Sequence, residues 1–357
     1  MKPLKILLGN NTFAMLAGSE TWMRTLALEL KKQGHSVEGF SPELGIISQE
    51  LQKNGVPCYN DISTSGIKPF SFILEESRNY DYDVIIASHW HIVKYLREQF
   101  PKTPIISVIH GVIHKTRDDA GREIDAPEHP ALDAQVNQFV AVSEEVREML
   151  LKEYRIDAML VRNFFDVKQF AAKRKIAAKP EQFLLNSNYI VPEDPEVNLM
   201  REVAKHYGAR LAVVGQNFVP AADIMKAIED SDVVIGMGRS VLEGVCAGRL
   251  GIVHGRWGYG GVIAEPNIEN LRYFNFSGRN SGGHLPSAQD IIAEIDRFYN
   301  PQTIAWGQKY IREQHNAVFA AEVLIQTARA LLEESVPAAD EVPLRPFRRA
   351  RDVAQSA

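Results

Sequence analysis

The segment Gly236-Met237-Gly238-Arg239-Ser240, with Glu243 three residues further on, combines flexible backbone with charge. A glycine-rich turn from a strand into a helix exposes backbone N–H groups, and with one guanidinium it suits a diphosphate. Glu243 lies in an otherwise apolar helix, where a buried carboxylate needs a hydroxyl or cationic partner such as a ribose diol. The competing interpretation is a solvent-facing glutamate, which the lack of an exposed polar face disfavours. We therefore predict that Gly238, Arg239, Ser240 and Glu243 bind a nucleotide.

Four histidines are candidates for a catalytic or binding position. His110 ends the apolar run Ile105–Ile109 and precedes a glycine, so we expect its imidazole to face a ligand. The alternative is a structural histidine that ends the strand. His89 and His91 follow another apolar run and are expected at the same rim, with a plain polar rim position as an equal alternative. His114 is close enough in sequence to be the functional residue instead of His110.

Two glycine-containing segments could place backbone near a ligand. Gly18-Ser19-Glu20 begins a helix, so its free N–H groups could meet phosphate or sugar oxygens; a tight strand-to-helix turn is the alternative. The run from His254 to Gly261 is predicted as a flexible loop after a strand. In it Arg256 is a second candidate phosphate contact, and Trp257 or Tyr259 could face a sugar or base. A plain surface loop is the alternative there.

Short apolar runs alternate with amphipathic segments, and this alternation predicts the elements that must position these residues. The predicted helices begin near Ser19 and Ser143, and others lie around Glu196–Tyr207, Ala222–Asp230 and Ser240–Ala247, with one or two terminal helices in Gln302–Glu334. The predicted strands are Leu4–Leu8, Ser36–Phe40, Val84–Ala87, Ile105–Ile109, Phe139–Val142, Met159–Val161, Phe183–Leu185, Leu211–Val214, Val233–Ile235 and Gly251–His254.

Parallel strands joined by helices require right-handed crossovers, so we predict an α/β fold of two Rossmann-like, doubly wound domains that face each other across a cleft. The first domain is predicted at 1–167. The segment 168–180 is the predicted linker. The second domain is predicted at 181–335, and its terminal helices are expected to be able to pack back on the first. Residues 336–357 are predicted as a flexible tail.

Composition limits the classes of function. The 357 residues carry 40 basic and 45 acidic side chains, a net charge of -5, so nothing favours nucleic acid or an anionic membrane as a main partner. The isolated Cys58 and Cys246 fit a reducing compartment and exclude a thiolate zinc site. No apolar stretch approaches a membrane span or a secretory signal, so we expect a cytoplasmic protein whose membrane contact, if any, is peripheral.

Four segments, in order, carry a family resemblance. They are Gly18-Ser19-Glu20 with Gly34-His35-Ser36-Val37, the strand ending in His110-Gly111, Val142-Ser143 with Arg162-Asn163 and Asp166-Val167, and Ser231–Ile235 with Leu242-Glu243-Gly244. Together they resemble the retaining GT-B glycosyltransferases related to sucrose, glycogen and mannosyl transferases, of the group 1, family 4-like type. The chain is identified as a divergent member. The resemblance implies that the first domain binds the acceptor and that the second binds the nucleotide-sugar donor. It further implies that Glu243 holds the nucleotide ribose and that His110 lies at the transferred sugar. It also implies that Gly260-Gly261 lie near the donor sugar and phosphates.

The sequence departs from this family in two places. Ile235 stands where the first of two glutamates is expected, eight residues before Glu243. The segment Leu185–Pro195 lacks the Arg and Lys that usually contact the pyrophosphate there, and Arg239, Arg256 or Arg162 could replace them. Asp81-Tyr82-Asp83 matches a metal-binding Asp-x-Asp pattern, but it directly precedes a strand, so we interpret it as structural and predict no metal.

The resulting prediction is an enzyme that moves a sugar from a nucleotide-diphosphate sugar to a hydroxyl acceptor with retention at the anomeric carbon, using no cofactor beyond this co-substrate. The acceptor class (saccharide, lipid-linked or small molecule) stays open. A first alternative is a nucleotide-sugar epimerase or hydrolase of the same fold, for which Glu20, Glu43 and Glu265 are the candidate acid/base residues. A second is a non-catalytic nucleotide- or sugar-binding relative.

Overall fold

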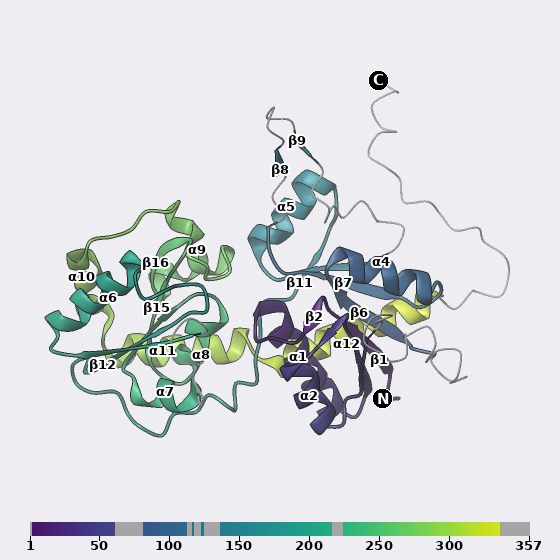
Figure 1. The fold of residues 1–357 in the computed structure, drawn as a ribbon, viewed down its shortest axis with the longest axis horizontal. Helices are drawn as coiled ribbons and strands as arrows, with labels where there is room; N and C mark the ends of the chain where they lie inside the picture. Colours follow the sequence, from purple (N-terminus) through teal and green to yellow (C-terminus); the bar gives the residue numbers. More distant parts are fainter. Residues whose placement is uncertain are drawn as a thin grey trace.

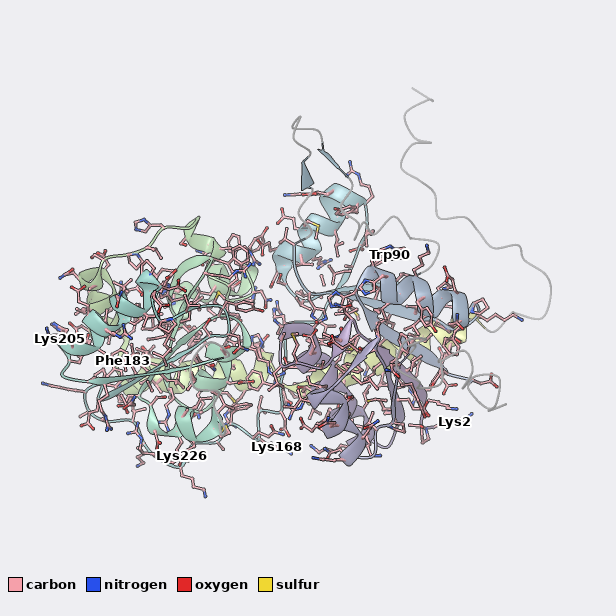
Figure 2. All side chains as sticks on the ribbon, viewed as in Figure 1. Lys2, Trp90, Lys168, Phe183, Lys205 and Lys226 are labelled. Carbon is pink, nitrogen blue, oxygen red and sulfur yellow. The ribbon has the colours of Figure 1, made fainter. Side chains whose placement is uncertain are left out.

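The computed structural model describes residues 2–60, 81–112, 116–117, 123–124, 136–215 and 224–335. In these residues the chain forms two α/β lobes that lie side by side (Figure 1). The predicted tail 336–357 and His114 lie outside the described residues. Figure 2 shows Phe183 inside the second lobe, where its side chain is fully buried, and Lys168 at the narrow region between the lobes.

The first lobe is built on a seven-stranded parallel sheet with the order β11-β10-β7-β6-β1-β3-β5. Two short pairs, β2 (Thr12–Phe13) with β4 (Glu43–Leu44) and β8 (Thr116–Arg117) with β9 (Glu123–Ile124), lie outside it. The strands of the main sheet are β1 (Lys5–Gly9), β3 (Ser36–Phe40), β5 (Cys58–Tyr59), β6 (Val84–Ser88), β7 (Ile105–Ile109), β10 (Gln138–Ala141) and β11 (Met159–Leu160).

Apolar residues run continuously through these strands because both faces of the sheet are covered. Ile6 and Leu8 pack in one hydrophobic cluster, whereas Leu7 between them packs in another. The helices of this lobe are α1 (Gly18–Lys32), α2 (Ile46–Lys53), α4 (Trp90–Gln99) and α5 (Glu144–Tyr154). The predicted N-cap of α5 is confirmed, since the Ser143 hydroxyl accepts a hydrogen bond from the backbone N–H of Val146 at 3.3 Å.

The second lobe has a five-stranded sheet with the order β13-β12-β14-β15-β16, in which only the β15–β16 pair is antiparallel. Its strands are β12 (Gln182–Asn186), β13 (Arg210–Val214), β14 (Val233–Gly236), β15 (Leu250–Gly255) and β16 (Gly258–Val262). Its helices are α6 (Pro195–His206), α7 (Ile224–Asp230), α8 (Arg239–Cys246), α9 (Ile268–Tyr273), α10 (Ala288–Phe298) and α11 (Pro301–Gln314), with 3₁₀ turns η1 (Glu265–Asn267) and η2 (Arg279–Ser281).

All ten predicted strands are present within one or two residues of their expected ends. One expectation is wrong: residues 258–261, predicted as part of a loop, belong to β16, so 254–261 forms a hairpin rather than a flexible loop. No helix among the described residues is both long and apolar enough to cross a membrane.

The chain passes between the lobes at two adjacent places. Phe165 donates its N–H to the carbonyl of His315 at 3.0 Å, and Ala317 donates to the carbonyl of Phe165 at 3.0 Å. Beyond this crossing α12 (Ala317–Ser335) returns to the first lobe, where Ala321 and Leu324 pack in the same core as β1 and α1 (Figure 1).

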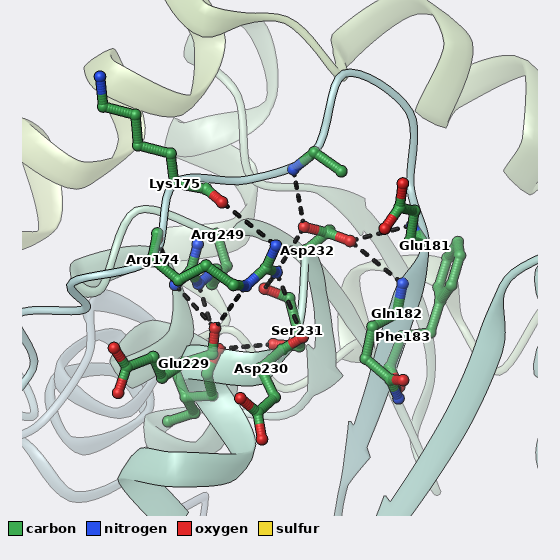
Figure 3. Close-up of polar contacts among 12 residues, drawn as sticks. Arg174, Lys175, Glu181, Gln182, Phe183, Glu229, Asp230, Ser231, Asp232 and Arg249 are labelled. Carbon is green, nitrogen blue, oxygen red and sulfur yellow. Dashed lines mark hydrogen bonds and ion pairs between the residues drawn. The ribbon is translucent and has the colours of Figure 1, made fainter.

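The segment 168–180 contains no helix or strand, yet it is tied to the second lobe (Figure 3). The fully buried carboxylate of Asp232 accepts hydrogen bonds from Arg174 Nη2 at 2.6 Å and from three backbone N–H groups, those of Ala177, Glu181 and Gln182. Arg249, also buried, donates to the carbonyl of Arg174 at 2.9 Å. These contacts anchor one side of the connection.

Carboxylates on α5 face charged or polar side chains of the second lobe. They form three contacts between the lobes, namely Glu144 with Arg272 at 2.9 Å, Glu145 with Arg279 (Oε1–Nε 3.0 Å) and Glu148 with the hydroxyl of Tyr273. Glu144 also pairs with Arg162 of its own lobe at 2.5 Å. This row of polar contacts holds the two lobes together on one side of the junction.

Candidate functional site

Each sheet has a point at which the strand order reverses direction, and the two points face the junction between the lobes. In the first lobe the reversal lies between β1 and β6, and in the second between β12 and β14. In open α/β sheets, ligands bind beyond the carboxyl ends of the strands at such a point. The loops after these four strands therefore form the candidate site.

The first-lobe side is formed by the start of α1. This helix begins at Gly18 after Ala17, whose side chain provides no cap. Its first N–H groups are therefore available to a ligand, and a side chain added at Gly18 would meet no atom within 4 Å. Ser19 lies in the first turn and its hydroxyl faces His89, whereas Glu20 is buried. The predicted loop residues thus surround an accessible helix N-terminus.

His89 and His91 follow β6 at the same rim. The Nε2 atom of His89 lies 3.2 Å from Ser19 Oγ, and that of His91 lies 2.8 Å from Asn11 Oδ1, in the loop after β1. His89 has a backbone φ of 65°, a conformation that non-glycine residues rarely adopt. The start of α4 therefore holds the imidazole of His89 against α1 at the expense of backbone strain.

His110 follows β7, next to this rim. Its Nε2 atom lies 2.8 Å from Ser88 Oγ, and its ring meets the edge of Trp22, with ring centroids 5.4 Å apart. Burial first, and the charge of His89 second, lower the pKa of His110 to about 3. The imidazole is therefore neutral near pH 7 and can act there as a hydrogen-bonding group rather than as a cation.

The second-lobe side is formed by the start of α8. Gly238 has φ 51° and donates its N–H to the carbonyl of Phe276 at 2.7 Å, and α8 begins at Arg239 without a side-chain cap. The positive φ explains why glycine stands at this position. Ser240 lies in the first turn of this helix, where the N–H groups and the helix dipole favour an anion.

Arg239 joins the two sides. Its Nη1 donates to the carbonyl oxygen of Thr21 in α1 at 2.9 Å and to Thr25 Oγ1 at 3.1 Å, while its Nε pairs with Glu243 Oε1 at 2.7 Å. The carboxylate of Glu243 is thus satisfied by a cation on its own helix. The spacing of four residues between Arg239 and Glu243 is the sequence signal for this pair.

The β15–β16 hairpin places Arg256 and Trp257 at its exposed turn. Gly260 lies in β16, where a Cβ atom would come within 2.7 Å of Val253 Cγ1, and Gly261 has φ 100°. Close packing and backbone conformation therefore already require both glycines. The Tyr259 hydroxyl points away to α10, where it donates to Glu294 at 2.7 Å.

Two side chains that the sequence did not single out belong to this region. Tyr189, in the loop after β12, packs against Arg256, and Asn188 donates from Nδ2 to the carbonyl of Leu16 in the other lobe at 3.3 Å. Both contacts join segments that are far apart in the chain, so no local sequence pattern predicts them. Glu43 and Glu265, the remaining candidate acid/base residues, are exposed on different lobes.

The Asp81-Tyr82-Asp83 segment is occupied by structural contacts. Asp83 Oδ2 accepts the backbone N–H of Lys5 at 2.7 Å, and the Tyr82 hydroxyl donates to Glu38 at 2.5 Å. Among the described residues no group of three or more His, Cys, Asp and Glu side chains is arranged to hold a metal ion. That the protein needs no metal stays a prediction.

Comparisons with known proteins agree with this geometry. Residues 16–169 match the family model described as Glycosyltransferase Family 4. No curated protein matches the sequence.

Solved structures match this chain along nearly their whole length. A glycosyltransferase from Rickettsia africae has 16% identity and a TM-score of 0.63, with 92% of this chain and 99% of that chain covered. Anabaena HepE in complex with UDP and glucose has 13% identity and a TM-score of 0.61, with 92% and 100% covered.

A proposed UDP-N-acetylglucosamine 2-epimerase from Listeria monocytogenes also matches, with 14% identity, a TM-score of 0.53 and coverage of 92% of this chain and 97% of that chain. At such identities the likeness shows the fold, and this chain has the GT-B fold. The fold alone does not choose between transferase and epimerase. The family-model match over the first lobe supports glycosyl transfer in general.

Proposed function

We propose that this chain is an enzyme that transfers a sugar from a nucleotide-diphosphate sugar to a hydroxyl acceptor with retention of anomeric configuration. The proposal starts from its GT-B fold and from the match of residues 16–169 to the model of Glycosyltransferase Family 4. The observation that carries this proposal is the junction of α1 and α8. Both helices begin without a side-chain cap at the reversal point of their sheets, and Arg239 links them. Two helix N-termini on either side of one junction suit a diphosphate.

The second lobe supplies the donor contacts in this proposal. The first turn of α8, with Gly238 and Ser240, faces the diphosphate through backbone N–H groups, and Arg239 adds charge. The free lone pairs of Glu243 accept hydrogen bonds from the ribose hydroxyls, since the Arg239 pair occupies Oε1. Gly260 and Gly261 keep side chains away from the donor as well as from the packed core. Arg256 is the remaining cation of this side.

In this proposal, residues of the first lobe contact the transferred sugar and the acceptor. The start of α1, Gly18 to Glu20, lies beside the phosphates and the sugar. His110, held by Ser88 and neutral near pH 7, hydrogen-bonds the sugar. His89 and His91 form the rim on which the acceptor hydroxyl is placed.

The proposed reaction needs no covalent bond between the protein and the sugar. The bond between the anomeric carbon and the donor phosphate oxygen breaks, the acceptor oxygen forms a bond to that carbon on the same face, and the acceptor proton passes to the departing diphosphate. Fixed N–H dipoles and a guanidinium stabilise the negative charge that develops on the leaving group. Binding donor and acceptor at one junction lowers the activation barrier, because the entropy cost of bringing the two reactants together is met on binding.

A panel of UDP, GDP, ADP and CDP and their sugars, followed by thermal unfolding, tests the donor. A ligand present at 100 times its dissociation constant stabilises the protein by about 2.7 kcal/mol. NMR of the product's anomeric proton then tests retention. Conversion of the donor sugar to an isomer or its hydrolysis without any acceptor would favour the epimerase or hydrolase. Tight nucleotide binding with no turnover would favour a non-catalytic relative.

A further inference from the structure

Arg256 differs from the other cations at the junction because it packs against two aromatic rings. Its guanidinium carbon lies 4.2 Å from the ring centroid of Trp257 and 5.2 Å from that of Tyr189. Both aromatic side chains are well exposed, at 41% and 56% of their full area. Two aromatic rings thus hold an exposed guanidinium at the tip of the β15–β16 hairpin.

Four other arginines near the junction are already paired with carboxylates, namely Arg239, Arg162, Arg272 and Arg279. For Arg256 the structure gives contacts with the two rings and, within the described residues, no carboxylate. An arginine that stacks on aromatic rings keeps its N–H edges available, because stacking uses only the face of the planar group.

Two contacts place Arg256 at the candidate site. The loop that carries Tyr189 reaches the first lobe through Asn188, which bonds to Leu16, two residues before the start of α1. On the other side, Gly255 packs so closely on Met237 that a Cβ atom would lie 2.5 Å from Met237 Cγ. Met237 directly precedes Gly238. The residue before Arg256 therefore packs next to the start of α8, and the loop that packs on Arg256 bonds next to the start of α1.

We infer that Arg256 is the second lobe's main side-chain contact for the donor diphosphate, and that Tyr189 and Trp257 are positioning residues that hold it there. The inference rests on the proposed function and deepens it. The loop after β12, Ser187 to Tyr189, carries no cation itself. The structure instead brings a cation to this loop from a hairpin almost seventy residues later in the chain, and uses an aromatic side chain of the loop to orient it.

Stacking has a physical advantage for an exposed arginine. A free arginine side chain loses rotamer entropy when a ligand fixes it. Rings on which the guanidinium already rests remove part of this loss before the ligand arrives. A lysine at the same position would keep the charge, but it would lose the planar group that stacks and that pairs with two phosphate oxygens at once.

The test compares Arg256→Ala with a matched control. Arg297 on α10 also stacks on an aromatic ring, with its guanidinium carbon 4.9 Å from the ring centroid of Phe298, but it lies outside the site. Calorimetry of UDP, GDP, ADP and CDP, and of inorganic pyrophosphate, is carried out on the wild type and both variants. We expect Arg256→Ala to weaken the best diphosphate and pyrophosphate about tenfold or more, as for a lost charge-assisted bond, with the nucleoside of the same base unaffected. Arg297→Ala should bind like the wild type.

Variants of the rings test the positioning role. Tyr189→Leu and Trp257→Leu keep apolar bulk but remove the aromatic face, and we expect each to weaken diphosphate binding several-fold without changing nucleoside binding or the melting temperature. Arg256→Lys should not restore the wild-type affinity. Because Arg256 is exposed, the difference between the wild type and Arg256→Ala should shrink between 0.05 M and 0.5 M salt, roughly where the Debye length falls below 10 Å.

The outcomes separate this inference from the function on which it rests. Wild-type affinity of Arg256→Ala for the best diphosphate would overturn the inference and leave the glycosyltransferase proposal intact. Equal loss of nucleoside and diphosphate binding would also overturn it, because the side chain would then act on the base or on folding. Pyrophosphate binding that depends on Arg256, in a wild type that binds none of the four nucleotides, would keep Arg256 as an anion contact and contradict the nucleotide donor. Failure of the wild type to bind any of these probes would overturn both.

Discussion

Arg239 Nη1, at the first residue of α8, lies 2.9 Å from the carbonyl oxygen of Thr21 in α1 and donates a hydrogen bond to it. The same guanidinium holds Glu243 on its own helix. A ligand that binds at the start of α8 therefore meets a side chain that already touches the opposite lobe. If the start of α8 binds the donor as proposed, Arg239 couples donor binding to the relative position of the lobes.

Arg239→Ala should weaken binding of the best nucleoside diphosphate more than that of its nucleoside, because only the diphosphate carries the charge that the guanidinium matches. Calorimetry of both ligands measures the difference. Arg279→Ala is the matched control, since Arg279 also joins the lobes, through Glu145, but on the η2 side. Equal losses for nucleoside and diphosphate in Arg239→Ala would assign the effect to the lobe contact alone.

Glu243→Ala should weaken nucleotide binding by about 1.5–3 kcal/mol, as expected for a lost hydrogen bond to a charged group. It also leaves the Arg239 guanidinium without its carboxylate, so part of the loss comes through Arg239. The double variant Arg239→Ala/Glu243→Ala measures that part, and we expect the two losses to be less than additive. Calorimetric affinity for the nucleotide that is unchanged in Glu243→Ala would remove this carboxylate from the site.

The sequence predicted the sheets well because their strands are buried on both faces. Runs such as Ile105–Ile109 contain almost only apolar residues, and no helical face could bury them all. β16 was missed because Gly258, Gly260 and Gly261 suggest a loop. The strand forms because β15 supplies hydrogen-bond partners. Glycine stands at residue 260 because a Cβ atom there would clash with Val253. Tertiary contacts here override local propensity.

The candidate site also has features that the sequence predicts and features that only the folded structure shows. The helix starts beside Gly18 and Gly238 follow from glycine placement after strands, and the sequence indicates both within one or two residues. The pairing of Arg239 with Glu243 was available from their spacing. The stack of Arg256 on Tyr189 and the bond from Asn188 to Leu16 depend on how the lobes and distant loops meet. No periodicity encodes such contacts, so only the folded structure reveals them.

His110→Ala should lower turnover by roughly 100-fold, the scale of one preorganised transition-state contact, with little change in nucleotide affinity. Because the pKa of His110 is about 3, turnover should show no inflection from this group between pH 5 and 8. Ser88→Ala, which removes the hydroxyl at His110 Nε2, should lower turnover less than His110→Ala. His114→Ala is the control within the neighbouring segment, and loss of turnover there with retention in His110→Ala would exchange the two assignments.

Asp232→Ala should lower the free energy of unfolding by about 3–5 kcal/mol, because it leaves Arg174 and three backbone N–H groups without their acceptor. Burial alone would raise the pKa of Asp232, but these hydrogen bonds outweigh it and lower the pKa. The stabilisation is thus present at neutral pH and is lost as pH falls through the folded-state value. Asp230→Ala is the control: its exposed ion pair with Lys226 should contribute less than about 1 kcal/mol. Similar urea midpoints for both variants would contradict the anchoring role of Asp232.

His315, at the crossing between the lobes, should make the protein sensitive to mild acid. Its side chain is 1% exposed, and Nδ1 lies 2.6 Å from the carbonyl oxygen of Asn163. Burial is the main cause that lowers the pKa of His315 from 6.5 to about 4. Between these values the unfolded chain binds a proton that the native protein does not. The free energy of unfolding therefore falls as pH decreases from 6.5 to 4, by about 3 kcal/mol from this group.

His315→Gln removes this titration while keeping a side-chain N–H that can reach the Asn163 carbonyl. We expect the variant to lose less stability than the wild type between pH 6.5 and pH 4, whatever its stability at pH 7. Urea unfolding at half-unit steps of pH measures the two slopes, and carboxylates such as Asp232 contribute equally to both, so the difference isolates His315. His284→Gln is the control because His284 is exposed. The prediction would be contradicted if the free energy of unfolding had the same slope against pH in His315→Gln, His284→Gln and the wild type. His315 would then have to become protonated inside the folded protein.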